Sequence, residues 1–380
     1  MLKLSILRFL TFLSFPLLFL ACIDPVEPEF QYEEDLLFID AFASTLPGAS
    51  NVTISETAVE FGVRVVNPVA GARVVFENTI NGEEVVLTEA MNSYIVDEDF
   101  AIIPGEIWRL VVVLENGKRI ESVEELVLDP VPIDDMQVNY VPELAFREIG
   151  GGKFVPGHRV TVNFNDPQQE DNYYYWSYRS FENLDYCKIC IEGLFRDGDC
   201  IAYDLRGRLR RYFNYICETD CWQIRYPDNI NIFNDQFTNG NAVTNLPVGD
   251  ILLNTKENMV VELQQFSLTP SAFEYYKVLK DIVDNSSGLN APPPAALIGN
   301  LFNPEDLDEV VLGRFTAAAS SVSSVFVERE SITQAPLETS DPIVLEPLIG
   351  SPYPPPATNF APCEESKFRT AIEPNGWMDN

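Results

Sequence analysis

The spacing of the cysteines limits most strongly how this chain can fold. Besides Cys22 the chain has six, five of them within one short stretch and the sixth near the C-terminus: Cys187, Cys190, Cys200, Cys217, Cys221 and Cys363. An even number of cysteines in an exported chain predicts disulfides and leaves their pairing open. Because five is an odd number, at least one bond should join the cluster to Cys363, tying the tail to the middle of the chain.

The N-terminus indicates that the chain is exported. Lys3 and Arg8 form a short basic segment, and residues 9–21 form an apolar run. A helix needs roughly 20 apolar residues to span a bilayer, so this run is too short for a membrane span. Its dimensions are those of a secretory signal, which we predict for residues 1–21.

Cys22 follows the small residue Ala21 directly, as in bacterial lipoprotein signals. We predict that cleavage leaves Cys22 as an acylated N-terminus, which makes the membrane a partner through the lipid anchor. Phe19 stands where such signals favour Leu, so the alternative is an ordinary signal peptide with an unmodified Cys22. Residues 22–35 are acidic and contain prolines, and such a segment forms a solvated tether.

The charge balance narrows the classes of partner. The chain has 58 acidic and 25 basic residues and a formal net charge of −33. This charge repels nucleic acid, which we exclude as a partner, and it favours cationic ligands. The acidic stretches at residues 97–100 and 303–309 could suggest calcium, but they lack the ligand order of a calcium loop and are better explained as solvated surface.

Residues 36–128 have the pattern of a β-sheet domain. Short strand-like segments alternate with turns, and the Asn81-Gly82 and Asn116-Gly117 pairs are typical of β-hairpins. About seven strands in roughly 100 residues, without helical periodicity, predict an immunoglobulin-like β-sandwich. The fold class is therefore mainly β.

A proline- and aspartate-rich linker precedes a second β-rich domain, which we predict for residues 138–329. Residues 186–226 should form a disulfide-rich insertion in it. One amphipathic helix is predicted for residues 270–285, capped by Thr269, with Phe273, Tyr276, Leu279 and Val283 on the face that packs on the sheet. Residues 330–380 are rich in proline and should form a wrapped or partly mobile C-terminal tail.

Few residues suggest catalysis. The single histidine, His158, should lie in a surface loop. The Cys187–Cys190 and Cys217–Cys221 pairs resemble a four-thiolate zinc site, and the first pair resembles a redox CxxC motif. The fifth cysteine between them and the exported context favour disulfides instead. We therefore predict no catalytic residue, no metal and no cofactor.

An aromatic run offers a candidate binding surface. In a strand over residues 173–176, Tyr173 and Tyr175 face one side while Tyr174 and Trp176 face the other. One side could form the core and the other a stacking platform for a sugar or peptide. Tyr173, Tyr175, Trp222 and Tyr226 are the candidate ligand or partner surface. The alternative is that both faces of the strand are covered.

Several segments, in this order, resemble the domain-of-unknown-function 4249 family of Bacteroidota surface lipoproteins. They follow Cys22 along most of the chain and read "FNDPQQEDNYYYWSY", "CKIC", "LTPSAFEYYKVLKDIVDNSSG", "APPPAALIGN", "VVLGRFTAA" and "CEESKFRTAIEPNGW". The resemblance implies an outer-membrane lipoprotein exposed at the cell surface, often accompanying a TonB-dependent receptor barrel. It implies no catalytic residues.

Three functions follow as hypotheses. The first is a non-catalytic module that captures an unknown small ligand, glycan or peptide for a TonB-dependent transporter, or docks onto it. The second is a structural or adhesive surface protein. The third is an extracellular glycan hydrolase using two carboxylates, which the sequence cannot single out among so many acids.

Overall fold

The computed structural model describes residues 36–60, 63–147, 152–168, 171–203, 212–285, 297, 299–337 and 342–378. The predicted signal, tether and lipidated Cys22 lie outside the described residues. The chain is mainly β, as predicted, with strands in several sheets and one helix in the described part. No helix among the described residues is long and apolar enough to cross a membrane.

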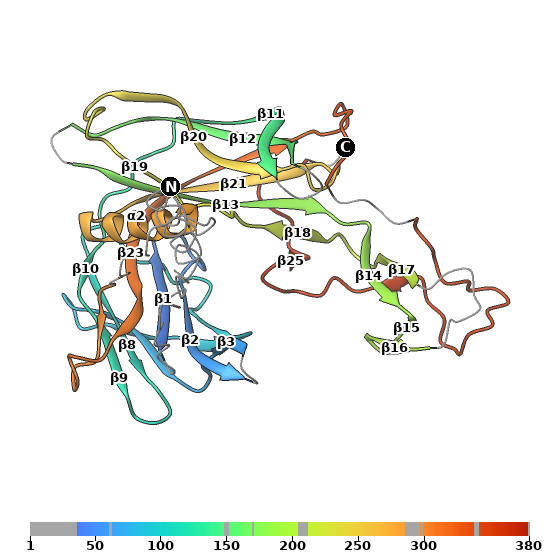
Figure 1. Ribbon diagram of the computed structural model, residues 1–380, viewed down its shortest axis with the longest axis horizontal. Helices are drawn as coiled ribbons and strands as arrows, with labels where there is room; N and C mark the ends of the chain where they lie inside the picture. Colours follow the sequence, from blue (N-terminus) through green and yellow to red (C-terminus); the bar gives the residue numbers. More distant parts are fainter. Residues whose placement is uncertain are drawn as a thin grey trace, which may run out of the picture.

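An eleven-stranded sheet forms the centre of the molecule (Figure 1). In spatial order it contains β25 (Arg369–Thr370), β18 (Trp222–Arg225), β13 (Tyr173–Asn183), β21 (Met259–Ser267), β23 (Val311–Val327), β1 (Leu37–Ser44), β2 (Asn51–Glu60), β7 (Ser93–Ile95) and β6 (Thr88–Ala90), with β19 (Asn231–Asn234) paired to β13 and β3 (Val63–Pro68) paired to β2.

Strand β23 joins the two halves of this sheet. Its residues 311–318 pair in parallel with β1, and its residues 319–327 pair antiparallel with β21. Gly313 lies in the left-handed region, with φ of +97°, where a Cβ atom would meet the carbonyl oxygen of Ile39 at 1.9 Å. Only glycine allows β23 to approach β1 this closely.

One face of the N-terminal half packs on a six-stranded sheet. That sheet contains β22 (Leu301–Phe302), β9 (Arg119–Ser122), β8 (Ile107–Val113), β4 (Arg73–Asn78), β5 (Glu84–Val86) and β10 (Glu125–Leu126). Ile39, Phe76, Leu110 and Phe315 are fully buried between the sheets. Both predicted Asn-Gly turns occur in its hairpins, with Gly82 and Gly117 at positive φ. The core is completed by β22 and β23, which come from beyond residue 300, and the immunoglobulin-like topology stays a prediction.

In the other half of the large sheet, which contains β13 and β21, the same face packs on a three-stranded sheet. It contains β11 (Asp135–Arg147), β12 (Lys153–Asn165) and β20 (Ala242–Leu252). Val160, Phe164, Tyr174 and Trp176 are buried between the two sheets, in a second hydrophobic core.

Helix α2 (Pro270–Asn285) covers the opposite face of the large sheet, where the two halves meet (Figure 1). Its bounds match the prediction, and Thr269 caps it by accepting a hydrogen bond from the Ala272 amide at 3.2 Å. Phe273 and Tyr276 are buried as predicted, but Val283 is 41% exposed. The prediction fails there because the helix buries residues of its first two turns only.

The cysteine-rich insertion forms a separate arm that projects from the body (Figure 1). Its strands are β14 (Tyr186–Ile191), β17 (Tyr212–Cys217) and β24 (Phe360–Ala361) in one sheet and β15 (Gly193–Arg196) and β16 (Asp199–Ala202) in a hairpin. The disulfides join Cys187 to Cys217, Cys190 to Cys200, and Cys221 to Cys363. The predicted bond from the cluster to Cys363 is confirmed.

The C-terminal tail wraps over both parts of the molecule. β24 pairs in parallel with β17 in the arm, and β25 pairs with β18 in the large sheet. Trp377 then contacts Trp222 and Phe326, with ring centroids 5.8 and 5.4 Å apart.

Candidate binding site

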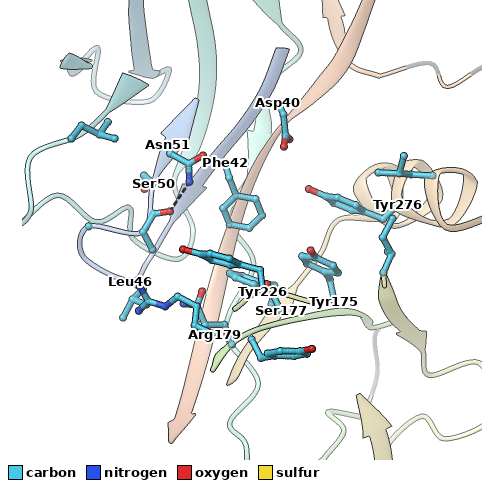
Figure 2. A pocket seen from close by; sticks show the side chains of 18 of the residues that line it. Asp40, Phe42, Leu46, Ser50, Asn51, Tyr175, Ser177, Arg179, Tyr226 and Tyr276 are labelled. Atoms are coloured by element: carbon cyan, nitrogen blue, oxygen red, sulfur yellow. Dashed lines mark hydrogen bonds between the residues drawn. The ribbon is translucent and has the colours of Figure 1, made fainter. Parts of the chain in front are cut away.

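A cavity of about 570 Å³ lies on the helix side of the large sheet, in the corner between the two halves. Its walls come from β1, the loop after it, β13, β21 and α2. Rings dominate the lining, with a smaller set of polar groups (Figure 2): Phe38, Phe42, Tyr175, Tyr178, Tyr226, Phe266, Tyr275 and Tyr276, with Asp40, Asn51, Ser177, Arg179 and Gln264.

The alternation of β1 places an acid in this cavity. Ile39 and Ala41 point into the N-terminal core and are buried. Phe38, Asp40 and Phe42 therefore face the other side of the sheet, where they line the cavity. Asp40 is exposed.

Strand β13 divides its aromatic residues in the same manner, as the sequence predicts. Tyr174 and Trp176 are 0% and 1% exposed, within the second core. Tyr173 and Tyr175 lie on the other face, partly buried against α2. Both faces of the strand are therefore covered in part, yet Tyr175 still borders the cavity.

The rings around Tyr175 form an ordered stack. Its ring is parallel to that of Tyr276, with centroids 4.9 Å apart and an interplanar angle of 5°. The ring of Phe266 also stacks on that of Tyr175, with centroids 5.7 Å apart. The Phe42 ring meets the Phe266 ring edge to face, with centroids 4.9 Å apart. Figure 2 shows the hydroxyl ends of Tyr175 and Tyr276 directed toward the space between Asp40 and Phe42. Stacking holds these rings in place before any ligand arrives.

The two charged side chains of the lining are in different states. Arg179 donates to Oε1 of Glu262 through Nε at 3.0 Å and through a terminal nitrogen at 2.6 Å. Asp40 has no ion pair within the described part of the chain. The lining thus has one neutralised cation and one carboxylate open to a ligand.

The tyrosine hydroxyls beside Asp40 remain protonated at neutral pH. Burial, and secondarily the charge of Asp40, raises the pKa of Tyr175 to about 12 and that of Tyr275 to about 12. The same two causes raise the pKa of Tyr276 well above its usual value. The Tyr276 hydroxyl already shares a hydrogen bond with the Thr316 hydroxyl at 3.2 Å, and that of Tyr175 bonds to Ser177, so each phenol has only part of its hydrogen-bonding capacity left for a ligand.

Of the four predicted surface residues, two line the cavity, namely Tyr175 and Tyr226. Tyr173 packs against Phe273 at 4.8 Å, away from it. Trp222 is only 2% exposed, because it lies beneath the C-terminal tail against Trp377. The prediction that Trp222 belongs to the ligand or partner surface is therefore corrected.

His158 is not in a surface loop, contrary to the prediction. It lies within β12, is 1% exposed, and meets the ring of Tyr140 edge to face at 5.5 Å. Burial, together with the charge of Arg329, lowers the pKa of His158 to about 4. The imidazole is therefore neutral at pH 7 and is part of the protein interior.

The cysteines form disulfides and not the alternative zinc or redox sites. The sulfur atoms of Cys187, Cys217 and Cys221 lie within 4.8 Å of one another, as they would around a metal. All three are used in disulfides, and Cys187 and Cys190 bond to other cysteines instead of to each other.

Sequence reasoning missed Asp40, Phe42 and Tyr276 as binding-site residues. One signal was present, since Asp40 is the single charge inside the apolar segment "LLFIDAFA". A charge at that position must face away from the core, which points to the opposite face of the strand. Nothing in the sequence placed that face against α2.

The comparison with curated proteins found no match for this chain. The scan against family models matched one family, described as a domain of unknown function (DUF4249), over residues 23–324. That range spans most of the chain and contains β1, β13, β21 and α2, which build the cavity. The chain therefore belongs to the DUF4249 family.

Proposed function

We propose that this protein is a lipid-anchored lipoprotein of the outer membrane, exposed at the cell surface, that captures a ligand for a TonB-dependent transporter without catalysing a reaction. The observation that supports it most is the preformed aromatic cavity. Ligand pockets typically enclose about 300–1,000 Å³ and combine apolar walls with a few polar groups. The cavity, at about 570 Å³, is within that range and has that lining.

The position of the cavity suits an anchored protein. The predicted tether, residues 22–35, ends just before β1, whose residues line the cavity. Fully extended, fourteen residues reach at most about 50 Å. An acylated Cys22 would thus hold the site near the membrane, within reach of a membrane-embedded partner.

The first test is isolation of the protein from its native membranes in mild detergent, followed by mass spectrometry. The proposal predicts acylated Cys22 and a β-barrel transporter in near-equal amount. A Cys22→Ser variant should fold normally, as shown by circular dichroism, but lose membrane retention and transporter-dependent uptake. A wild-type protein that is acylated yet elutes alone, or normal uptake by Cys22→Ser, would contradict the proposal.

A second test asks whether the cavity itself is used. Ser177→Trp should fill the cavity from its β13 wall, whereas Thr161→Trp places the same side chain on the outer face of β12, which does not line the cavity. We expect uptake to be lost with the first variant and kept with the second. Equal uptake by both folded variants would show that the cavity is not the capture site.

The structural or adhesive alternative is supported by the arm. Ile189 and Ile191 on β14 are 55% and 77% exposed, and Ile349 in the tail is 96% exposed. Exposed apolar groups on a stiff projection suit protein contacts. In that case, Ile191→Asp would abolish surface adhesion without changing uptake. The hydrolase alternative is weaker, because among the described residues of the lining Asp40 is the single carboxylate, where two are needed.

A further inference from the structure

We infer that the cavity binds an organic cation, a primary alkylammonium group such as the end of a lysine side chain or of a polyamine, with Asp40 as its counter-ion. This inference rests on the proposed function and names the ligand class of the same site. It is carried by the carboxylate of Asp40, which has no ion pair within the described residues, by the apolar walls around it and by the oxygen atoms beside it.

The carboxylate is the first part of the argument. Asp40 and Arg179 are the acid and the base of the lining, and Arg179 is already bound by Glu262 at 2.6 Å. Burial raises the pKa of Asp40 and the charge of Lys367 lowers it by less; the Lys367 ammonium lies 5.6 Å from the ring centroid of Tyr226, a lining residue, but Lys367 itself does not line the cavity. The cavity therefore keeps a negative charge that a cationic ligand would neutralise.

The chemistry of the walls selects an ammonium carried on an apolar stem. Phe42, Leu46, Ile230 and Leu279 supply apolar surface. An ammonium has three donors and needs acceptors, which the carboxylate of Asp40 and the tyrosine hydroxyls near it can provide. Because the faces of Tyr175 are covered by Tyr276 and Phe266, its hydroxyl is the group offered to the ligand.

The charge of the whole molecule acts in the same direction. At a net charge of −33, the protein attracts cations from solution and repels anions. This general attraction is screened at physiological salt, where the Debye length is about 8 Å. Selective binding must therefore come from the cavity, and a matched control can separate the two effects.

The experiment compares n-pentylammonium with 1-pentanol, a neutral ligand of similar size, by ligand-observed NMR. It uses the full chain in non-ionic detergent at 150 mM salt. Asp40→Asn removes the carboxylate from the cavity, and Asp308→Asn removes one from an exposed turn far along the chain. Both variants change the net charge by the same amount.

For the wild type we expect pentylammonium to bind about tenfold more tightly than pentanol, as for a partly desolvated charge pair. Asp40→Asn should abolish this preference, and Asp308→Asn should retain it. Equal binding of the two ligands by the wild type, or equal losses in the two variants, would overturn the inference. So would tight binding of a neutral oligosaccharide, such as maltotriose, that survives Asp40→Asn.

Failure of this inference can be told apart from failure of the proposed function. If Ser177→Trp abolishes uptake while no alkylammonium binds, the cavity is the capture site and the ligand class assigned to it is wrong. If pentylammonium binds through Asp40 but Ser177→Trp leaves uptake unchanged, the ligand class is right and the transporter role is wrong.

Discussion

The body and the cysteine-rich arm are stabilised in different ways. In the N-terminal half of the body, 22 buried residues form one core between two sheets, and none is a cysteine. The arm has a core of eight, of which three are cysteines. A small unit buries too little apolar surface to offset the entropy of its ordered chain, so it needs covalent links. The comparison shows that the disulfides stabilise a part of the chain whose core is much smaller than that of the N-terminal half.

The arm and the body each contain a buried ion pair. In the arm, Arg196 is held by Glu346 at 2.5 Å, and Glu346 also accepts from Tyr215 at 2.9 Å. In the body, Arg329 is held by Glu182 at 2.6 Å. Each pair joins segments distant in the sequence, and each becomes costly when one partner is removed.

The largest effect should come from the disulfide that ties the tail to the arm. Removing it with Cys221→Ser and Cys363→Ser releases a loop closed over 142 residues, worth about 5 kcal/mol by chain entropy. We expect faster hydrogen exchange in β14, β17 and β24 and unchanged exchange in β21 and β23. The control is removal of Cys190–Cys200, which spans 10 residues and should cost about 3 kcal/mol. Equal loss of protection in the body would contradict the independence of the two parts.

Removal of a buried carboxylate tests the comparison next. Glu346→Gln and Glu182→Gln should each destabilise by about 3–5 kcal/mol, because a buried arginine loses its counter-charge. The first should expose the arm to proteolysis and the second should lower the melting temperature of the body. Glu84→Gln, whose partner Arg73 is exposed, should cost less than about 1 kcal/mol. If Glu346→Gln and Glu182→Gln both lower the midpoint of the same unfolding transition, the arm and the body unfold as one unit.

His158 should make the body, and not the arm, sensitive to acid. Its folded pKa of about 4 lies below the ordinary value of 6.5, so the unfolded chain binds the proton more readily. Stability is therefore full above pH 6.5 and falls between pH 6.5 and 4, by up to about 3 kcal/mol. His158→Phe should flatten this part of the urea-denaturation profile. If the His158→Phe variant shows the same slope as the wild type in this pH range, the acid sensitivity comes from carboxylates and not from His158.

The smallest effect should come from the helix cap beside the cavity. Thr269→Ala removes the bond to the Ala272 amide and the bond that Thr269 donates to Glu125 at 2.9 Å, costing about 1 kcal/mol. Thr269→Ser keeps the hydroxyl and should be nearly neutral. The measurement is chemical denaturation, with pentylammonium binding as a second readout because α2 carries Tyr276. Equal stability of the two variants would show that the cap contributes little.

The elements that follow from local chemistry were predictable. The 3.6-residue spacing of Phe273, Tyr276 and Leu279, with Thr269 before it, defined helix α2. Alternation placed Tyr174 and Trp176 in the core. Errors arose where the outcome depends on distant segments. Trp222 was predicted to belong to a binding surface, yet the tail covers it. His158 follows Pro-Gly like a loop residue, yet it is paired within β12.

Periodicity, capping and cysteine number were enough to predict a mainly β protein with a capped helix and a disulfide between the cysteine cluster and Cys363. The pairing of β23 with both β1 and β21, and the cavity that Asp40 shares with Tyr175 and Tyr276, became visible in the three-dimensional fold alone. Strand alternation tells which residues share a face, but strand pairing across hundreds of residues, and the neutralisation of each charge, depend on contacts that no local pattern encodes.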